Sequence, residues 1–223
     1  MKYPPFILAS YGWFLWLPIG IGGAALGALA VWLAWWWLLG VVLIVTLALL
    51  LFFRDPPRTV PNGPGIMVAP ADGKVTLIET LDNFAPLGGP ALKISIFLSV
   101  LDVHVNRMPC AGTITDIQRA AGLYLDARHP EASYKNQYLM LVINDPNDGQ
   151  PLAAVKQIVG AIARRILTPA RPGQLFARGE RYGMIAFGSR TELIVPHPQQ
   201  WEVLVKLDQK VTGGVTQMIR KRG

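Results

Sequence analysis

Charged residues are absent from Tyr3 through Phe53, and the first to follow are Arg54 and Asp55. A bilayer core needs about 20 apolar residues per helix, so this stretch is long enough for two membrane helices. A secretory signal peptide is a poor alternative, because its apolar region is only about 7–15 residues long. We therefore predict a membrane hairpin over residues 1–53, with helices at about 11–31 and 33–53. A single long tilted helix is the other possibility.

Cysteine and histidine are both scarce. The single cysteine, Cys110, cannot form an intrachain disulfide, which is compatible with the cytoplasm. The three histidines and this cysteine show no zinc-type spacing, and no glycine-rich phosphate loop precedes a helix. Neither a metal nor a nucleotide is indicated. The net charge of +7 comes without a basic–aromatic stripe or a recognition helix, which argues against nucleic acid.

Basic residues flank the apolar stretch on both sides. Lys2 precedes it, and Arg54 and Arg58 follow it. Such residues stay on the cytoplasmic side of a membrane, and a hairpin places its two ends on one side, so the rest of the chain is predicted to be cytoplasmic. An anionic leaflet attracts a basic surface by roughly 1 kcal/mol per well-placed cation. The basic residues at 220–222 are a candidate contact, or else a solvated tail.

After residue 53 the sequence indicates a proline-rich linker and then short strands. Prolines at 56, 57, 61 and 64 predict an extended linker over 54–65. Apolar residues recur at every second position over 92–100 and 201–207. Turn residues separate further strand candidates at 73–80, 112–118, 137–144, 155–165, 183–187 and 190–195. Residues 66–223 are therefore predicted to form a mostly β domain, a compact antiparallel barrel or sandwich.

The Gly188–Ser189 bond is a candidate for self-cleavage. A serine hydroxyl can attack the preceding carbonyl when the backbone is strained, and a glycine there tolerates that strain. The resulting ester can lose the α-proton of Ser189 and leave dehydroalanine, which hydrolyses to a pyruvoyl group. Gly-Ser pairs are also common in ordinary turns, so the neighbouring residues must decide.

Two other residues are candidates for acid–base chemistry. His104 lies where we predict a strand, and alternation would place Asp102 on the same strand face. Asp72 precedes Gly73 in a predicted turn, and its carboxylate could orient a histidine as in a catalytic triad. For His104 and Asp72 a purely structural role is the alternative.

Three functions are compatible with these residues. One is pyruvoyl chemistry at Ser189. The second is a membrane-anchored serine hydrolase that uses Ser189, His104 and Asp72, although the Gly-x-Ser-x-Gly pattern is absent around Ser189. The third is a non-catalytic β module tethered to the membrane.

Five sequence blocks, in this order, resemble the short bacterial form of phosphatidylserine decarboxylase. They are the apolar hairpin with FFRDPPR (52–58), APADGK (69–74), FLSVLDVHVNRMP (97–109), VKQIVGAIARR (155–165) and GERYGMIAFGSRTELIVP (179–196). The resemblance implies a proenzyme that cuts itself into a β chain, 1–188, and an α chain, 189–223. Ser189 would become a pyruvoyl group that forms a Schiff base with phosphatidylserine and yields phosphatidylethanolamine. Asp72 and His104 would assist Ser189 in a serine-protease-like cleavage.

The match departs from longer family members at one position. Those members carry a second histidine three residues after the first, where this chain has Arg107. His104 would then do both jobs, or another residue would take one of them. We predict that Arg107 and Lys74 contact the substrate phosphate.

The resemblance also implies a location and partners. The chain is expected at the bacterial inner membrane, with its catalytic domain on the cytoplasmic side. Its expected partners are a membrane phospholipid, an anionic membrane surface and the two chains of one precursor, with a homo-oligomer as an open alternative. A serine headgroup on an ether lipid is a second candidate substrate.

Overall fold

A computed structural model describes residues 8–161, 165–186 and 189–222 of the chain. The chain divides into two compact units, Met1–Pro57 and Arg58–Gly223. The predicted Lys2, Phe187 and Gly188 lie outside the described residues.

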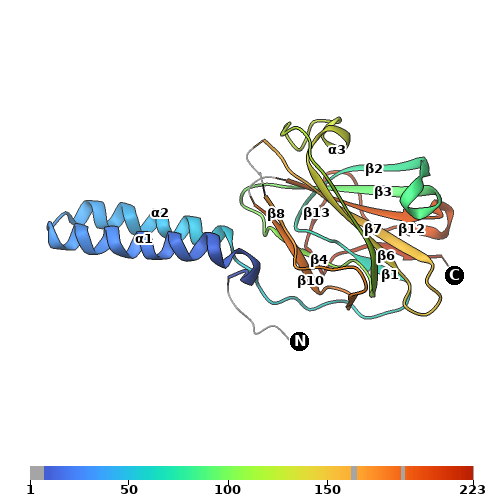
Figure 1. Ribbon diagram of the computed structural model, residues 1–223, viewed down its shortest axis with the longest axis horizontal. Helices are drawn as coiled ribbons and strands as arrows, with labels where there is room; N and C mark the ends of the chain where they lie inside the picture. The colour runs from blue at the N-terminus through green and yellow to red at the C-terminus, as the bar shows by residue number, and fades with distance from the viewer. Residues whose placement is uncertain (1–7, 162–164, 187–188, 223) are drawn as a thin grey trace. The chain divides into compact units, whose positions relative to one another are not determined.

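The first unit is helical. The short helix η1 (Ser10–Gly12) precedes α1 (Trp13–Trp32), and α2 is Trp36–Phe52. Figure 1 shows α1 and α2 side by side, joined by a short turn. A Cβ atom at Gly23 would collide with the side chain of Thr46, so the glycine allows the two helices to approach closely. The predicted helices had bounds of about 11–31 and 33–53.

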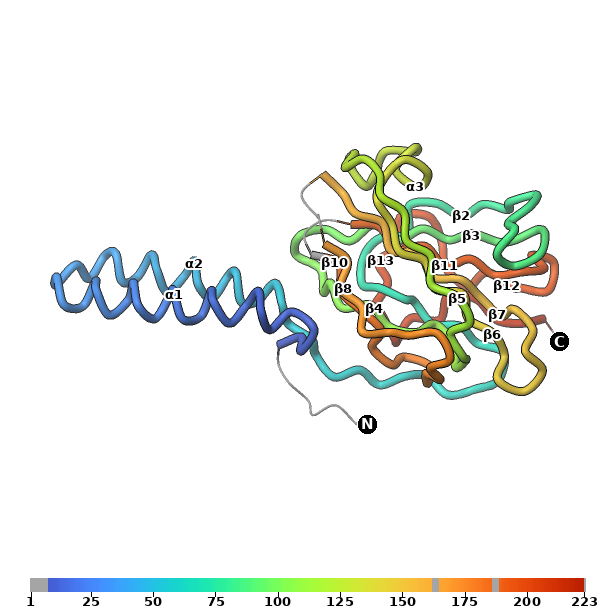
Figure 2. Tube along the Cα trace, viewed as in Figure 1, coloured from blue at the N-terminus to red at the C-terminus, as the bar shows by residue number. Residues whose placement is uncertain are grey.

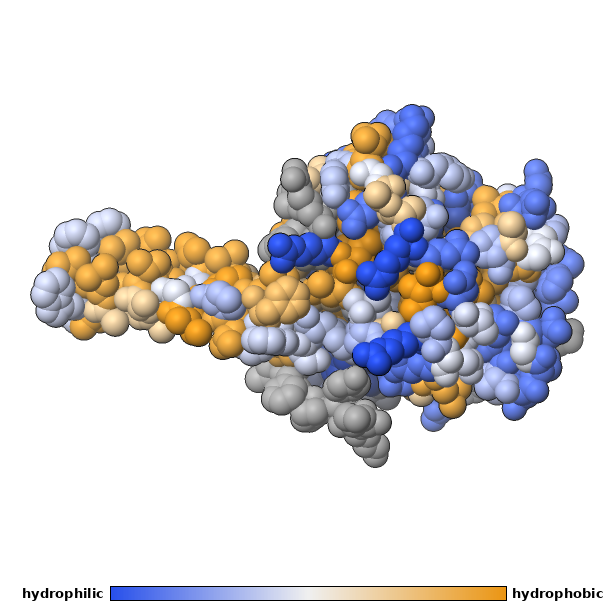
Figure 3. Space-filling view, in the orientation of Figure 1, coloured by the Kyte–Doolittle hydropathy of each residue, from blue (hydrophilic) through white to orange (hydrophobic). Residues whose placement is uncertain are grey.

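Apolar side chains cover the outside of this unit, as the orange surface in Figure 3 shows. Among the described helices, the stretch Ser10–Trp32 is the one long and apolar enough to cross a membrane by length and composition, while α2 is shorter at 17 residues. Trp32 is 80% exposed and Ile44 is 71% exposed. An exposed apolar surface of this extent marks a site of membrane or protein association, and here it indicates membrane association.

The second unit is built of β-strands, so the prediction of a mostly β domain is confirmed. Its strands are β1 (Ile66–Val68), β2 (Gly73–Phe84), β3 (Gly89–Leu98), β4 (Val105–Arg107), β5 (Gly112–Ala120), β6 (Tyr138–Asn144), β7 (Pro151–Ile158), β8 (Arg165–Leu167), β9 (Leu175–Phe176), β10 (Arg181–Ala186), β11 (Ser189–Pro196), β12 (Trp201–Val203), β13 (Lys210–Val211) and β14 (Gln217–Lys221). Its short helices are η2 (Ala85–Leu87), α3 (Ala132–Lys135) and η3 (Pro198–Gln200).

Strand β11 lies inside the largest sheet. The order of that sheet is β13-β2-β3-β11-β7-β6-β5-β9, and two smaller sheets have the orders β1-β14-β12 and β4-β10-β8. The pairs are antiparallel, with Ser189 opposite Leu98 and Arg190 opposite Ile158. The neighbours of β11 come from distant parts of the chain, as the tube in Figure 2 shows. The consecutive strands β10 and β11 therefore belong to different sheets.

Every residue of β11 is buried, which means that both faces of the sheet are covered at this strand. Alternation directs Ser189, Thr191 and Leu193 to one face and Arg190 and Glu192 to the other. The first face contacts the main apolar core, which includes Leu193, and the second carries charged side chains.

Three strand predictions are wrong in detail. The strand predicted over 155–165 is interrupted, because β7 ends at Ile158 and β8 begins at Arg165. The strand predicted over 201–207 ends at Val203, because the next residues form a turn in which Gln209 Oε1 accepts a hydrogen bond from Lys206 N. The residues before His104 form a turn closed by Asp102 instead of a strand, so the predicted shared strand face does not exist.

Candidate active site

Ser189 is the first residue of β11 and is fully buried. Its Oγ atom has no hydrogen-bond partner among the described residues. A buried hydroxyl left without a partner costs about 1–3 kcal/mol, and native proteins keep such groups where they serve a function. Its preceding residue, Gly188, lies outside the described residues. Ser189 is thus placed and buried as a reactive hydroxyl would be.

His104 is also fully buried. Its Nδ1 lies 2.9 Å from the carbonyl oxygen of Asp102. A carbonyl oxygen can only accept a hydrogen bond, so Nδ1 carries the hydrogen, and Nε2 holds the lone pair when the ring is neutral. The carbonyl oxygen of His104 accepts a 3.3 Å hydrogen bond from the backbone of Ile185, four residues before Ser189. The ring therefore has the tautomer of a base that acts through Nε2.

A buried amide network joins the His104 segment to β11. Asn106 Nδ2 donates to Thr191 Oγ1 at 3.0 Å, and Gln157 Nε2 donates to Asn106 Oδ1 at 2.6 Å. His104 lies two residues before Asn106, and Ser189 lies two residues before Thr191. The hydrogen bond between Asn106 and Thr191 therefore holds the two segments together within two residues of His104 and Ser189. No sequence pattern predicts this network, because Asn106, Gln157 and Thr191 are isolated polar residues in distant segments.

Asp72 is held by two hydrogen bonds. Arg58 Nη2 donates to Oδ2 at 2.8 Å, and the backbone nitrogen of Gly213 donates to Oδ1 at 2.7 Å. Burial raises the pKa of Asp72 above its usual value; the hydrogen bonds from Gly213 and Arg58 oppose this, and the negative charge of Asp102 adds to it. Both oxygens of Asp72 are thus engaged by Arg58 and Gly213, and Nδ1 of His104 is engaged by the carbonyl oxygen of Asp102.

The Asp72 turn is linked to the amide network. The carbonyl oxygen of Pro70 accepts a hydrogen bond from Asn106 Nδ2 at 3.3 Å and another from the backbone of Arg107 at 2.9 Å. The structure therefore brings the turn of Asp72 and the segment of His104 together through Asn106. The same amide ties that segment to β11.

The two residues predicted to contact phosphate have protein partners. Arg107 is buried, and its Nη1 donates to the carbonyl oxygen of Gly179 at 3.2 Å. Lys74 is half-exposed and forms a 2.7 Å ion pair with Asp208. Their contact with phosphate stays a prediction.

The opposite face of β11 carries a network of charged groups. Glu192 accepts hydrogen bonds from Ser95 Oγ at 3.3 Å and Ser133 Oγ at 3.0 Å, and Arg190 Nη1 lies 3.8 Å from it. Burial lowers the pKa of Lys93, but its hydrogen bond to Glu79 and the charge of Glu192 outweigh this and raise it. These buried charges stabilise one another and are paired.

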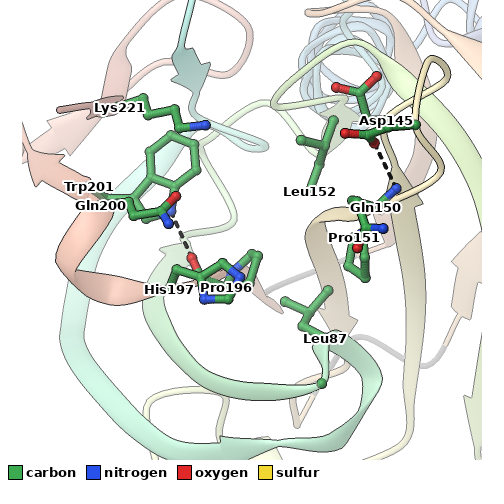
Figure 4. A pocket seen from close by; sticks show the side chains of 12 residues that line it. Leu87, Asp145, Gln150, Pro151, Leu152, Pro196, His197, Gln200, Trp201 and Lys221 are labelled. Atoms are coloured by element: carbon green, nitrogen blue, oxygen red, sulfur yellow. Dashed lines mark hydrogen bonds between the residues drawn. The ribbon is translucent and has the colours of Figure 1, made fainter. Parts of the chain in front are cut away.

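A cavity of about 550 Å³ lies at the Pro196 end of β11, opposite the Ser189 end. Figure 4 shows Asp145 on one side of it and Trp201 and His197 on the other, with Trp201 Nε1 donating to Pro196 O at 2.8 Å. None of the predicted site residues lines it. Within the described ranges, no group of three or more His, Cys, Asp or Glu side chains is arranged to hold a metal ion.

Comparison with known proteins identifies the family of the chain. A family model described as phosphatidylserine decarboxylase matches residues 45–218. The chain is 39% identical to a phosphatidylserine decarboxylase proenzyme of Rhodopirellula baltica, over 94% of this chain and 78% of that protein. It is 37% identical to the proenzyme of Cupriavidus metallidurans, over 97% of this chain and 96% of that protein. It is 43% identical to the proenzyme of Trichlorobacter lovleyi, over 97% and 93%.

Proposed function

The chain belongs to the phosphatidylserine decarboxylase family, and we propose that it decarboxylates phosphatidylserine after cutting its own backbone between Gly188 and Ser189. The observation that carries the proposal is the buried Ser189 hydroxyl, which has no partner among the described residues and begins a strand tied to the His104 segment. The products would be phosphatidylethanolamine and CO₂.

The first step is an attack of Ser189 on the peptide bond that precedes it. Attack of its Oγ on the carbonyl of Gly188 would exchange the amide bond for an ester. Removal of the Ser189 α-proton would then break the ester and leave Gly188 with a free carboxylate. Water would convert the remaining dehydroalanine into a pyruvoyl group and ammonia. Burial of Ser189 supports this route, because it keeps competing water away from the ester.

His104 would move the protons. With Nδ1 hydrogen-bonded to the Asp102 carbonyl, Nε2 is the atom that can take a proton from Ser189. After cleavage the same ring could deliver the proton that replaces the carboxyl group of the substrate. One histidine would then serve both steps, which accommodates Arg107 at the position where longer relatives have a second histidine.

Asp72 would act through its fixed carboxylate. Arg58 and Gly213 hold its two oxygens, and Asn106 connects its turn to the segment of His104. A negative charge in this position favours the protonated form of a nearby histidine. Arg58 would thus be a positioning residue for Asp72.

A pyruvoyl group made from Ser189 would supply a carbonyl that binds the amine of the substrate and accepts the electron pair left by CO₂. The residues present fit such a group, since its precursor hydroxyl is buried and among the described residues has no partner to hold it. We further propose that Arg107 and Lys74 contact the lipid phosphate. We place the enzyme at the inner membrane, with the β unit on the cytoplasmic side.

Intact-mass measurement of the purified full chain tests the proposal. We expect two fragments, 1–188 and 189–223, the second with a carbonyl-reactive blocked N-terminus. Ser189→Ala should remain a single 24.4 kDa chain without decarboxylase activity. An uncut wild-type chain that reacts with a fluorophosphonate at Ser189 would instead indicate a serine hydrolase.

A further inference from the structure

The turn that precedes His104 presents two apolar side chains to solvent. Asp102 N donates to Ser99 O at 3.0 Å, and Asp102 Oδ2 accepts hydrogen bonds from Ser99 N at 2.8 Å and Ser99 Oγ at 2.7 Å. Val100 and Leu101 at its centre are 48% and 83% exposed. Glycine, proline, asparagine and aspartate usually occupy such positions. Val100 and Leu101 therefore form an exposed apolar tip, which the hydrogen bonds between Ser99 and Asp102 hold in place.

This tip lies at the active-site end of the β unit. Leu98, the last residue of β3, pairs with Ser189. The carbonyl of Asp102, at the base of the turn, accepts the hydrogen bond of His104 Nδ1. The residue that closes the turn thus also orients the proposed base.

Cations lie on the strands and segments next to this turn. Lys210, Lys74 and Phe97 are in register across β13, β2 and β3. The guanidinium of Arg128 lies 5.7 Å from the ring centroid of Phe97, and Arg165 is exposed opposite the backbone of Ala186. Two of the four cations are paired, Lys74 with Asp208 and Arg128 with Asp126. Asp102 of the turn adds a third carboxylate to Asp208 and Asp126, so the four cations still leave a positive balance, which suits an anionic surface.

The chain that connects the apolar helices to this end of the β unit is short. Arg58 bonds Asp72, which directly precedes β2 at its active-site end. Five residues separate Arg58 from Phe52, the last residue of α2, and they span at most roughly 20 Å even when fully extended.

We propose that Val100 and Leu101 insert into the boundary between headgroups and acyl chains of an anionic bilayer, so that the membrane meets the β unit beside the segment of His104. The inference rests on the proposed function in taking a bilayer phospholipid as substrate. Insertion would bring the turn, and with it the Asp102 carbonyl that orients His104, to the depth at which a serine headgroup lies.

Spin labelling tests the insertion directly. Leu101→Cys is labelled with a nitroxide in the full chain, reconstituted in vesicles of equal parts phosphatidylglycerol and phosphatidylcholine, so that the readout does not depend on turnover. Leu175→Cys is the matched control, because Leu175 is 62% exposed on β9 at the opposite end of the sheet. The native Cys110 should not interfere, since it is buried and burial raises its pKa to about 12.

We expect the label at 101 to be more accessible to oxygen than to a water-soluble nickel complex, and the label at 175 to show the reverse. Equal accessibility at the two positions would overturn the proposal. That result is separable from a failure of the proposed function, because self-cleavage of the same labelled chains, and their decarboxylation of phosphatidylserine in a second set of vesicles, are measured separately and would be normal. Insertion without decarboxylation would support the turn and count against the function.

Activity gives a second readout. Leu101→Ser should lower the decarboxylation rate on bilayer substrate by about tenfold through a higher KM, the order expected for losing one buried leucine side chain. Leu101→Phe should restore it, and Leu175→Ser should have little effect. A Leu101→Ser chain with wild-type KM on vesicles contradicts the proposal.

Discussion

Strand β11 has two buried faces of opposite character. On the face of Ser189, the described partners of Thr191 and Asn106 are neutral hydroxyl and amide groups. On the face of Arg190, Glu192 lies among cations. The neutral face fixes geometry without placing a charge against the serine, whereas the charged face binds the strand to its cover through paired charges. One strand can therefore serve chemistry and stability separately.

His104→Ala should have the largest effect and should act on the neutral face alone. Loss of a general acid–base lowers rates by about 10²–10⁴-fold, so both cleavage and decarboxylation should fall by that order. Cleavage is followed by gel electrophoresis and decarboxylation by CO₂ release. His197→Asn, in the distant cavity, should leave both unchanged. Cleavage of the His104→Ala chain at the wild-type rate would remove His104 from the proposal.

Glu192→Ala should break the charged face. Removing one partner of a buried charge network leaves uncompensated charges and costs about 3–5 kcal/mol in the free energy of unfolding. The measurement uses the full chain in detergent with Ser189→Ala, so that one uncut chain unfolds. Glu192→Gln removes the charge and keeps one acceptor oxygen, while the other serine hydroxyl can accept a hydrogen bond from the new amide nitrogen, so the loss of stability in this variant reports mainly on the charge. Equal stability of the Glu192→Ala chain and its parent would show the network to be unimportant.

Thr191→Val should cost less, about 1–3 kcal/mol, because it leaves one donor of Asn106 without its partner while keeping the volume. Unlike Glu192→Gln it should also slow self-cleavage, since Asn106 then no longer ties the His104 segment to β11. Thr76→Val, at an exposed position, should change stability by no more than ~0.5 kcal/mol. If Thr191→Val and Thr76→Val cleave themselves at the same rate, the amide network has no positioning role.

The smallest effect should be the pH dependence of stability that Lys156 contributes on the charged face. Burial lowers the pKa of Lys156 below 10.5, against the charge of Glu192. Between that lowered pKa and 10.5 the unfolded chain binds more protons, so Lys156 makes stability rise with pH there. In the Ser189→Ala background, the free energy of unfolding of the parent should therefore rise relative to that of its Lys156→Met variant as pH approaches 10.5. A decrease of this difference over the same pH range would contradict the expected sign.

The sequence was sufficient for the fold class because period-two patterns report strands directly. It was misleading about burial. Lys93 and Ser95 alternate with apolar residues and look like a solvent face, yet both are buried, because residues around Ser133 and Tyr134 cover them from a distant part of the chain. Local patterns carry no information about such a cover.

The site shows the same limit. Ser189 and His104 could be selected from their chemistry and from the resemblance, and their roles stay predictions. The partner of Asp72 could not be foreseen, since Arg58 lies fourteen residues earlier, within the proline-rich linker. The Asn106, Gln157 and Thr191 contacts depend on how two sheets meet, which no single segment encodes.

The placement of β11 between β3 and β7 determines whether the two pieces of a cut molecule can separate. If the chain is severed before Ser189, the 35-residue product still forms an inner strand of the largest sheet and cannot leave without dismantling it. The two pieces would be inherited, exported or degraded together, and a worn catalytic piece could not be exchanged for a fresh one. Replacing an inactivated enzyme would therefore require synthesis of the whole chain, because neither piece can be replaced alone.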